Sequence, residues 1–230
     1  KIAHADLDDD GDYDFVIGTY TSGVSLYYQE NIGNRTHPEW HIHEPNTGMF
    51  NGMSGYLGTQ AWPQLFDFDN DGDYDLFICF HYSNRIHLWE NTGNKGNPLF
   101  THRNDVLSGN PVGEITHINK YSSIFFSDLN GDNRADLIIG TYDGQIEYYE
   151  SIPAKTKAIV IEATESILPK FSSYKWHKYP RPAFIDMDND GDKDLIIGTN
   201  LGFLLYYENI GSAKNSYYQS RSEYYCYIND

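Results

Sequence analysis

Short apolar runs alternate with polar, glycine-containing turns along the whole chain, and no stretch shows the 3.6-residue period of an amphipathic helix. Runs of five to seven residues rich in Val, Ile, Tyr and Phe come in pairs, such as LIIGTY followed by QIEYYES. Tight turns join the pairs, as at Asp143-Gly144 and Leu201-Gly202, which is typical of β-hairpins. A further apolar run precedes each hairpin and a more polar one follows it. The pattern predicts four-stranded antiparallel units and very little helix.

An acidic stretch of nine residues recurs immediately before each hairpin. It reads DLDDDGDYD from Asp6, DFDNDGDYD from Asp67, DLNGDNRAD from Asp128 and DMDNDGDKD from Asp186. The spacing of about sixty residues marks an internal repeat present in four copies. We expect one domain over 1–230, with repeats at approximately 1–45, 62–104, 121–163 and 181–225.

Four antiparallel strands in a repeat of this length are typical of a β-propeller blade. A solenoid would have shorter repeats and parallel coils, and a helical array would show the helical period. We therefore predict an all-β propeller with four four-stranded blades in this chain. We expect these blades to be a fragment of a longer array; the alternatives are that four blades close alone or assemble with other copies.

The composition limits the class of function. The 230 residues carry a formal net charge of −17, which disfavours binding to nucleic acid or to an anionic membrane face. The chain is nevertheless 40% apolar and 16% aromatic, enough to form a core rather than a disordered tail. Its two cysteines do not make a disulfide framework, and no apolar run is long enough to span a bilayer.

Each acidic loop presents oxygen ligands at its first, third, fifth and ninth positions and a backbone carbonyl at the seventh. Calcium accepts six to eight oxygens in flexible geometry, whereas magnesium demands an octahedron and retains waters, so we predict about four calcium ions, one per loop. The predicted side-chain ligands are Asp6, Asp8, Asp10, Asp14, Asp67, Asp69, Asp71, Asp75, Asp128, Asn130, Asp132, Asp136, Asp186, Asp188, Asp190 and Asp194. The predicted carbonyl ligands are Asp12, Asp73, Arg134 and Asp192.

Two alternatives to such a site were weighed. An EF-hand needs Glu at the twelfth position, which is Ile in all four loops, and each loop leads into a strand. Solvated turns without an ion would leave several carboxylates repelling one another within nine residues, four times over. The third loop differs, because Gly131 has moved to the fourth position and Arg134 adds a positive charge, so we expect weaker calcium binding there.

The combined motif is an acidic D-x-[DN]-x-D-x-x-x-D loop, an apolar strand with Gly, and then G-x-x-x-YYEN-x-G. It resembles the FG-GAP/VCBS family of calcium-binding propeller repeats, which are related to the blades of integrin α-subunits. The resemblance implies a β-propeller, commonly seven-bladed, with calcium in the loop between the first two strands of a blade. The family's strand glycine falls at Gly18, Gly140 and Gly198, with Cys79 in the second copy, so Cys79 is interpreted as a small strand residue rather than a catalytic thiol.

The segments that join successive repeats are long and unlike one another, and in a propeller they emerge opposite the calcium loops. Loops on a rigid scaffold often carry binding function, and aromatic side chains mixed with His and Arg suit a sugar or a protein. The alternative is that several of these aromatics fill gaps between blades. The predicted ligand face comprises Tyr20, Tyr56, Trp62, His81, Tyr82, Arg85, Tyr142, Trp176, His177 and Tyr179.

The sequence offers no sign of catalysis in this chain. It contains neither G-x-S-x-G nor H-E-x-x-H, and the loop carboxylates are committed to ions. His41 and His43 would share one strand face and could bind zinc, but an exposed alternating strand gives the same pattern. We expect a non-enzymatic, calcium-stabilised extracellular module for adhesion or for binding a protein or glycan, without nucleic-acid binding or membrane insertion. The alternatives are an accessory domain of a polysaccharide-active enzyme and a structural unit of a surface assembly or filament.

Overall fold

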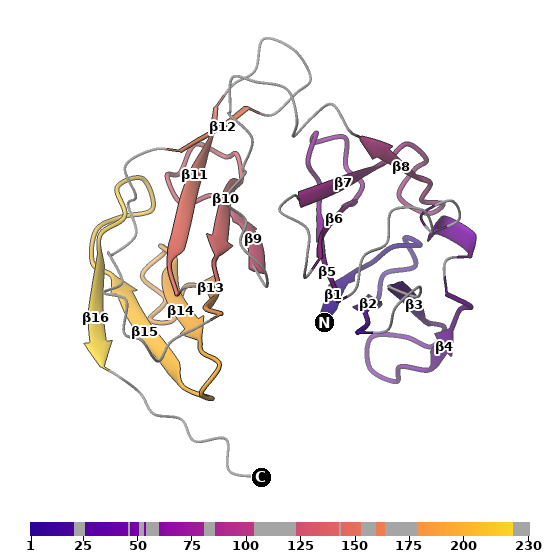
Figure 1. The fold of residues 1–230 in the computed structure, drawn as a ribbon, viewed down its shortest axis with the longest axis horizontal. Coiled ribbons are helices and arrows are strands. Elements are labelled where there is room, and N and C mark those ends of the chain that lie inside the picture. The colour runs from indigo at the N-terminus through magenta and orange to yellow at the C-terminus, as the bar shows by residue number, and fades with distance from the viewer. Residues whose placement is uncertain are drawn as a thin grey trace. The chain divides into compact units, whose positions relative to one another are not determined.

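The computed structural model describes residues 1–20, 26–45, 47–50, 53, 60–80, 86–103, 123–142, 144–152, 160–163 and 179–222. These residues form four antiparallel four-stranded sheets in which each strand pairs with the next along the chain (Figure 1). The helical structure within the described residues is limited to the 3-10 conformation, at η1 (Gly48–Phe50) and at Met53. The predicted all-β architecture with four propeller blades is therefore confirmed.

The first two blades follow one another in the chain. Blade 1 consists of β1 (Ile2–Ala5), β2 (Asp14–Gly18), β3 (Leu26–Asn31) and β4 (Trp40–Ile42). Blade 2 consists of β5 (Ala61–Phe66), β6 (Asp75–Phe80), β7 (Ile86–Asn91) and β8 (Phe100–Arg103).

The other two blades repeat this order. Blade 3 consists of β9 (Ser123–Ser127), β10 (Asp136–Gly140), β11 (Ile146–Ile152) and β12 (Val160–Ala163). Blade 4 consists of β13 (Arg181–Ile185), β14 (Asp194–Gly198), β15 (Leu204–Asn209) and β16 (Tyr218–Ser222). In every blade the acidic loop joins the first strand to the second, as the repeat predicted.

The hairpin turns also have the predicted chemistry where they are described. Between β14 and β15, Thr199 donates its backbone N–H to the Phe203 carbonyl at 3.0 Å, and Gly202 has a φ of +80°. A side chain at that φ is strained, which accounts for the glycine at the tip.

The chain divides into two compact units. One comprises Lys1–Lys120 with Thr156–Ile159 and contains blades 1 and 2; the other comprises Tyr121–Lys155 with Val160–Asp230 and contains blades 3 and 4. In the first unit a buried cluster joins the two blades through residues such as Val16 and Leu26 of blade 1 and Ile78 and Phe100 of blade 2. In the second unit a corresponding cluster joins blades 3 and 4. The hydrophobic core therefore lies between blades, where removal of apolar surface from water stabilises their contact.

Two strand glycines lie where the next blade crosses. A Cβ built on Gly18 would lie 2.0 Å from the carbonyl oxygen of Ala61, and one on Gly140 would lie 2.1 Å from that of Pro180. Both distances are far below van der Waals contact, so only glycine fits. The family glycine in the strand is thus explained by the close approach of the following blade's first strand.

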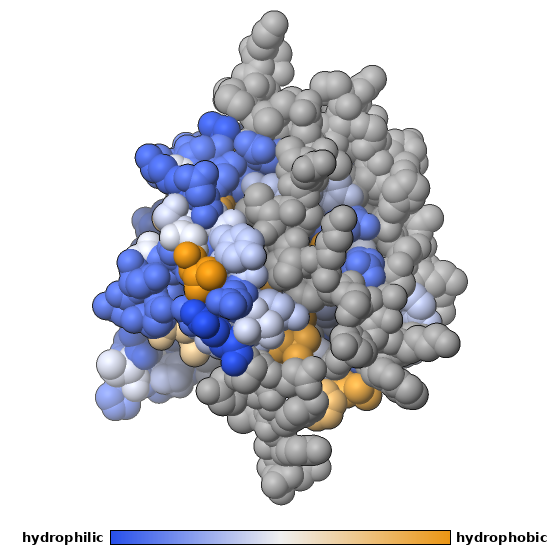
Figure 2. Space-filling model, turned by 90° about the vertical axis from the view of Figure 1, so that its left-hand side faces the viewer, coloured by the Kyte–Doolittle hydropathy of each residue, from blue (hydrophilic) through white to orange (hydrophobic). Residues whose placement is uncertain are grey.

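Most of the described residues that are visible on the side of β16 are hydrophilic, with some apolar residues exposed among them (Figure 2). Within the described part of the chain, no helix has the length and apolarity to cross a membrane.

Candidate metal centre

The backbone of each acidic loop turns through two residues in the left-handed region. In the first loop these are Asp9 (φ +62°) and Gly11 (φ +97°), at the fourth and sixth positions. The third loop uses the same two positions with the residue types exchanged, Gly131 at +70° and Asn133 at +64°. Gly, Asn and Asp are the residues that tolerate this conformation. The displaced glycine of the third loop therefore preserves the loop's shape.

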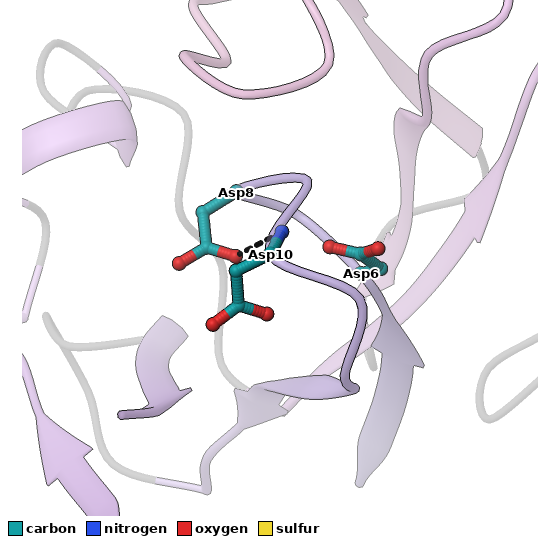
Figure 3. Close-up of side chains that lie close together, drawn as sticks. All are labelled: Asp6, Asp8 and Asp10. Carbon is teal, nitrogen blue, oxygen red and sulfur yellow. Dashed lines mark hydrogen bonds between the residues drawn. The ribbon is translucent and has the colours of Figure 1, made fainter. Parts of the chain in front are cut away.

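This shape brings the carboxylates of the first, third and fifth positions together. One oxygen from each of Asp6, Asp8 and Asp10 lies within 4.8 Å of the others, and the three side chains lie close together at the loop (Figure 3). The same convergence recurs in loops two and four, at Asp67, Asp69, Asp71, Asp186, Asp188 and Asp190.

Backbone amides of the loop fix these side chains. Asp6 Oδ2 accepts a hydrogen bond from the Gly11 N–H at 3.2 Å, Asp8 Oδ1 from Asp10 at 3.3 Å, and Asp10 Oδ1 from Asp12 at 3.1 Å. Each bond uses one carboxylate oxygen and leaves lone pairs for another partner. The cluster is thus pre-organised by the loop before any ion binds.

The donor set fits a hard cation. Asp6 Oδ1, Asp67 Oδ1 and Asp69 Oδ1 are buried and have no hydrogen-bond partner among the described residues. Burial, reinforced by the neighbouring carboxylates of Asp14 and Asp10, raises the pKa of Asp8 to about 6. Buried, unpaired, mutually repelling carboxylate oxygens are what a divalent cation would stabilise.

The ninth-position aspartates have a second role that the spacing did not show. Asp14 is buried, and its two oxygens accept hydrogen bonds from the backbone N–H groups of Leu7 (3.0 Å) and Asn31 (2.9 Å). Asp75 is bonded in the same way to Phe68 and Asn91, each at 2.8 Å. The ninth-position carboxylate therefore links the acidic loop to the third strand by hydrogen bonds. In the first loop its negative charge also contributes to the raised pKa of the third-position residue, Asp8.

The seventh-position side chains are also buried, although only their carbonyls were predicted as ligands. Asp12, Asp73 and Asp192 have little exposed surface. Burial, followed by the charges of Asp71 and Asp69, raises the pKa of Asp73 to about 6. The alternating acidic pattern of the loop contained this signal, since the seventh position is Asp in three of the four copies.

A family model for the FG-GAP-like repeat matches residues 67–139 and 128–197, more than half of the chain. The chain belongs to the FG-GAP-like repeat family. Each matched stretch begins at one acidic loop and ends in the second strand of the following blade. A search of functionally curated proteins finds no match.

Among solved structures, the chain is similar to a lectin of Agrocybe aegerita whose structure is described as the basis of specific recognition of non-reducing terminal N-acetylglucosamine. The TM-score is 0.56 at 14% sequence identity, over 97% of this chain and 52% of the lectin chain. The chain thus spans about half the length of that lectin. At this identity the similarity shows the fold.

The third FG-GAP repeat differs in its electrostatics. Its third position is Asn130, whose amide group donates to Glu150 Oε1 at 3.2 Å, and the Arg134 guanidinium forms an ion pair with Asp132. One predicted ligand is therefore neutral and another already has a cationic partner. These contacts are the physical reason to expect weaker calcium binding in this loop.

The next repeat also touches the acidic loop, a contact that sequence reasoning missed. The turn between β7 and β8 of blade 2 places Lys95 Nζ 2.7 Å from Asp9 Oδ1 in the loop of blade 1. In the second unit, Ser216 Oγ in the β15–β16 turn of blade 4 donates to the Leu129 carbonyl in the loop of blade 3 at 2.8 Å. The repeated N-x-G motif of these turns was the available signal.

Part of the predicted ligand face is described. Tyr20 is exposed, the Lys1 ammonium lies 4.8 Å from the Trp62 ring centroid, and the rings of Tyr142 and Tyr179 meet edge to face at 5.2 Å. The remaining predicted residues fall outside the described part of the chain: Tyr56, His81, Tyr82, Arg85, Trp176 and His177.

The histidine pair and the cysteine have ordinary surroundings. His43 Nε2 lies 2.6 Å from Glu30 Oε2, and the His41 ring meets the His43 ring edge to face at 4.6 Å. Cys79 is buried in β6, and burial raises the pKa of its thiol to about 12. A thiol with so high a pKa is a poor nucleophile at neutral pH, as expected of a small strand residue.

Proposed function

We propose that this FG-GAP chain is a calcium-stabilised, non-enzymatic binding module. The observation that carries the proposal is the convergence of three carboxylates within 4.8 Å in three of its loops. The ligands would be the first-, third-, fifth- and ninth-position side chains of each loop together with the seventh-position carbonyl. A bound calcium ion would neutralise these carboxylates and clamp the loop.

An extracellular location follows from the same chemistry. Calcium sites in extracellular modules typically have dissociation constants of roughly 0.1–1 mM. We propose that these exposed loops bind calcium in that range. The family membership supports the proposal of calcium binding. The formal charge of −17 supports it as well, because about four bound calcium ions would neutralise much of that charge.

The ligand that we propose is a glycan or a protein bound opposite the calcium loops. Aromatic side chains such as Tyr20 and Tyr142 offer flat apolar surfaces for a sugar ring or an interface. The fold that the chain shares with an N-acetylglucosamine-specific lectin favours a glycan.

Isothermal titration of calcium into metal-free protein tests the ion sites. We expect saturable binding that is lost from three loops in the triple variant D8N/D69N/D188N, and kept in the variant Asp9→Asn, which removes a loop charge outside the cluster. Binding that is identical in all three proteins would contradict the assignment.

A glycan array with and without EGTA tests the proposed ligand. Glycan signals that are present in calcium and disappear with EGTA would support the proposal. An array without any signal in calcium would count against a glycan.

A further inference from the structure

The third strand of every blade pairs with the second strand in one register, and this register places a side chain beside the ninth-position aspartate. In blade 1, Tyr28 lies opposite Val16, which is two residues after Asp14. Alternate residues of a strand share a face, so Tyr28 and Asp14 are diagonal neighbours, a separation that an aromatic side chain can span. The equivalent pairs are Tyr148 with Asp136, Tyr206 with Asp194, and Leu88 with Asp75. The position is therefore tyrosine in three blades and leucine in one.

In blade 4 the tyrosine hydroxyl is hydrogen-bonded to this aspartate. Tyr206 Oη donates to Asp194 Oδ2 at 3.0 Å, and the same carboxylate accepts two backbone N–H groups at 3.0 and 2.8 Å. One of its three donors thus comes from a side chain of the third strand. In blade 3, burial, the charge of Asp136 and a hydrogen bond to that carboxylate raise the pKa of Tyr148. The hydroxyl and the ninth-position carboxylate are therefore neighbours in both blades.

In blade 1 the corresponding hydroxyl is buried, and Tyr28 is only 7% exposed. The hydroxyl makes no well-formed hydrogen bond to any described residue. Burial, followed by the charges of Asp14 and Asp8, raises the pKa of Tyr28. Burial also raises the pKa of Asp14, and the amides of Asn31 and Leu7 and then the Tyr28 hydroxyl oppose this rise, so the hydroxyl is within reach of the carboxylate. A buried hydroxyl without a good acceptor destabilises a fold, so packing alone does not explain a tyrosine here.

Blade 2 shows that a blade forms without this hydroxyl. Leu88 occupies the position and is buried, with 1% of its surface exposed. Asp75 beside it still accepts the backbone N–H groups of Phe68 and Asn91. The two backbone bonds to the ninth-position carboxylate are thus kept where the tyrosine is absent. They link the acidic loop to the third strand in that blade, which leaves the tyrosine free for a different role.

We propose that the third-strand tyrosine is a positioning residue for calcium, holding the ninth-position carboxylate of loops one, three and four in place for the ion. The inference rests on the proposed function, because that carboxylate is one of the proposed ligands. Hydrogen-bond donors around a metal site orient the ligating carboxylates, and their removal typically lowers metal affinity about 10- to 100-fold. The second loop has no such donor from the third strand and relies on its backbone amides.

Thermal unfolding over a series of calcium concentrations tests the proposal, because the rise in melting temperature reports the dissociation constant of the ion. The parent proteins have two acidic loops disabled. D8N/D69N leaves loop four as the strongest site, and D69N/D188N leaves loop one. Tyr206→Phe in the first parent and Tyr28→Phe in the second should each raise the calcium dissociation constant about tenfold or more.

Two controls have the same parents or an equivalent one. Tyr149→Phe removes a hydroxyl that donates to Glu147 Oε2 at 2.7 Å, a tyrosine–carboxylate bond outside the acidic loops. It should leave the calcium dependence of both parents unchanged. Leu88→Met, a volume-conserving change at the position without a hydroxyl, should leave that of loop two unchanged in the parent D8N/D188N. A tenfold change with either control would mean that any alteration of the third strand weakens the sites, and would overturn the specific role of the hydroxyl.

The melting temperature in EGTA separates positioning from folding. Tyr28→Phe removes a buried hydroxyl that lacks a good acceptor, so its melting temperature in EGTA should equal or exceed that of its parent. A lower melting temperature in EGTA with an unchanged calcium dependence would mean that the tyrosine acts in folding alone, and would overturn the inference. Parents whose melting temperature does not respond to calcium would instead overturn the proposed function, so the two failures are distinguishable.

Discussion

The carboxylate of Asp14 accepts a hydrogen bond from the backbone N–H of Asn31 at 2.9 Å, although the two residues lie 17 positions apart. The Asn31 side chain in turn accepts hydrogen bonds from the N–H groups of Gly33 (3.1 Å) and Glu39 (3.0 Å). One buried aspartate thus connects the acidic loop to the β3–β4 turn. The link recurs between Asp194 and Asn209 at 2.8 Å.

Removing this link should destabilise the protein even without calcium. Asp14→Ala leaves two buried N–H groups without an acceptor, at a cost of about 2–4 kcal/mol. The measurement is urea unfolding in EGTA. Asp9→Asn is the control, because Asn tolerates the left-handed backbone at this position and the change removes only an exposed ion pair, worth about 0–1 kcal/mol. Equal effects of the two substitutions would mean that Asp14 acts only as an ion ligand.

The close approach at Gly140 gives a second prediction. Gly140→Ala would place a methyl group 2.1 Å from the Pro180 carbonyl oxygen, so blades 3 and 4 must separate or distort. We expect a loss of about 1–3 kcal/mol in the free energy of unfolding. Gly198→Ala is the matched control, at the same position of its strand but with the nearest atom 3.8 Å from the added methyl group, and should cost little. A tolerated Gly140→Ala would contradict the packing of the two blades.

The local pattern of the chain predicted most of the fold. The more polar run that follows the hairpin forms the outer strand, Phe100–Arg103 in blade 2 and Tyr218–Ser222 in blade 4, because a period of two bounded by turn residues is a local signal. Contacts between repeats were not predictable in this way. Spacing does not show that Lys95 reaches Asp9, or that Cys79 is buried.

The sequence predicted which loop carboxylates come together, but not how they are held in place. The alternating aspartates identify the positions, and the structure brings the first, third and fifth together. Which carboxylate oxygens accept hydrogen bonds from backbone amides depends on the position of the third strand, as where the Asn31 N–H donates to Asp14. That position is set by the tertiary structure and cannot be read from the loop sequence. The ligand face was the part that the sequence pattern defined least, because much of it lies in long connections without periodicity.

The pH dependence of stability should change sign with calcium. Burial, with added repulsion from nearby carboxylates, raises the pKa of Asp8 to about 6 and that of Asp75 to about 7 in the folded protein. Unfolded aspartate titrates near 4, so the folded metal-free protein binds more protons between about pH 4 and 7 and gains stability as the pH falls from 8 to 5. Calcium needs ionised ligands, so the loaded protein should lose stability over the same fall.

Urea midpoints of resin-stripped and calcium-saturated protein at pH 8, 6.5 and 5.5 would measure this sign. Asp8→Asn should reduce the gain of the metal-free protein on acidification. Metal-free protein that is most stable at pH 8 would show that the loop carboxylates do not carry the raised pKa values.

Arg134 should weaken the third ion site through its ion pair with Asp132. Arg134→Gln frees the carboxylate, and one charge at this distance near the surface is worth about 1 kcal/mol, or roughly a fivefold gain in calcium affinity. Calorimetric titration would resolve the change in the weakest site. Lys1→Gln makes the same change of charge beside Trp62, at the end of β1 opposite the acidic loop, and an equal gain there would mean that only net charge matters.

The central claim is that calcium holds the acidic loops of the folded protein, and thermal unfolding of one preparation in 1 mM calcium and in excess EGTA tests it most directly. Binding at several sites, each contributing about 0.4–1.4 kcal/mol when 1 mM calcium meets dissociation constants of roughly 0.1–1 mM, should raise the melting temperature by several degrees. The rise should be much smaller in magnesium and in the triple variant D8N/D69N/D188N. A melting temperature that is the same in calcium and in EGTA would contradict the claim.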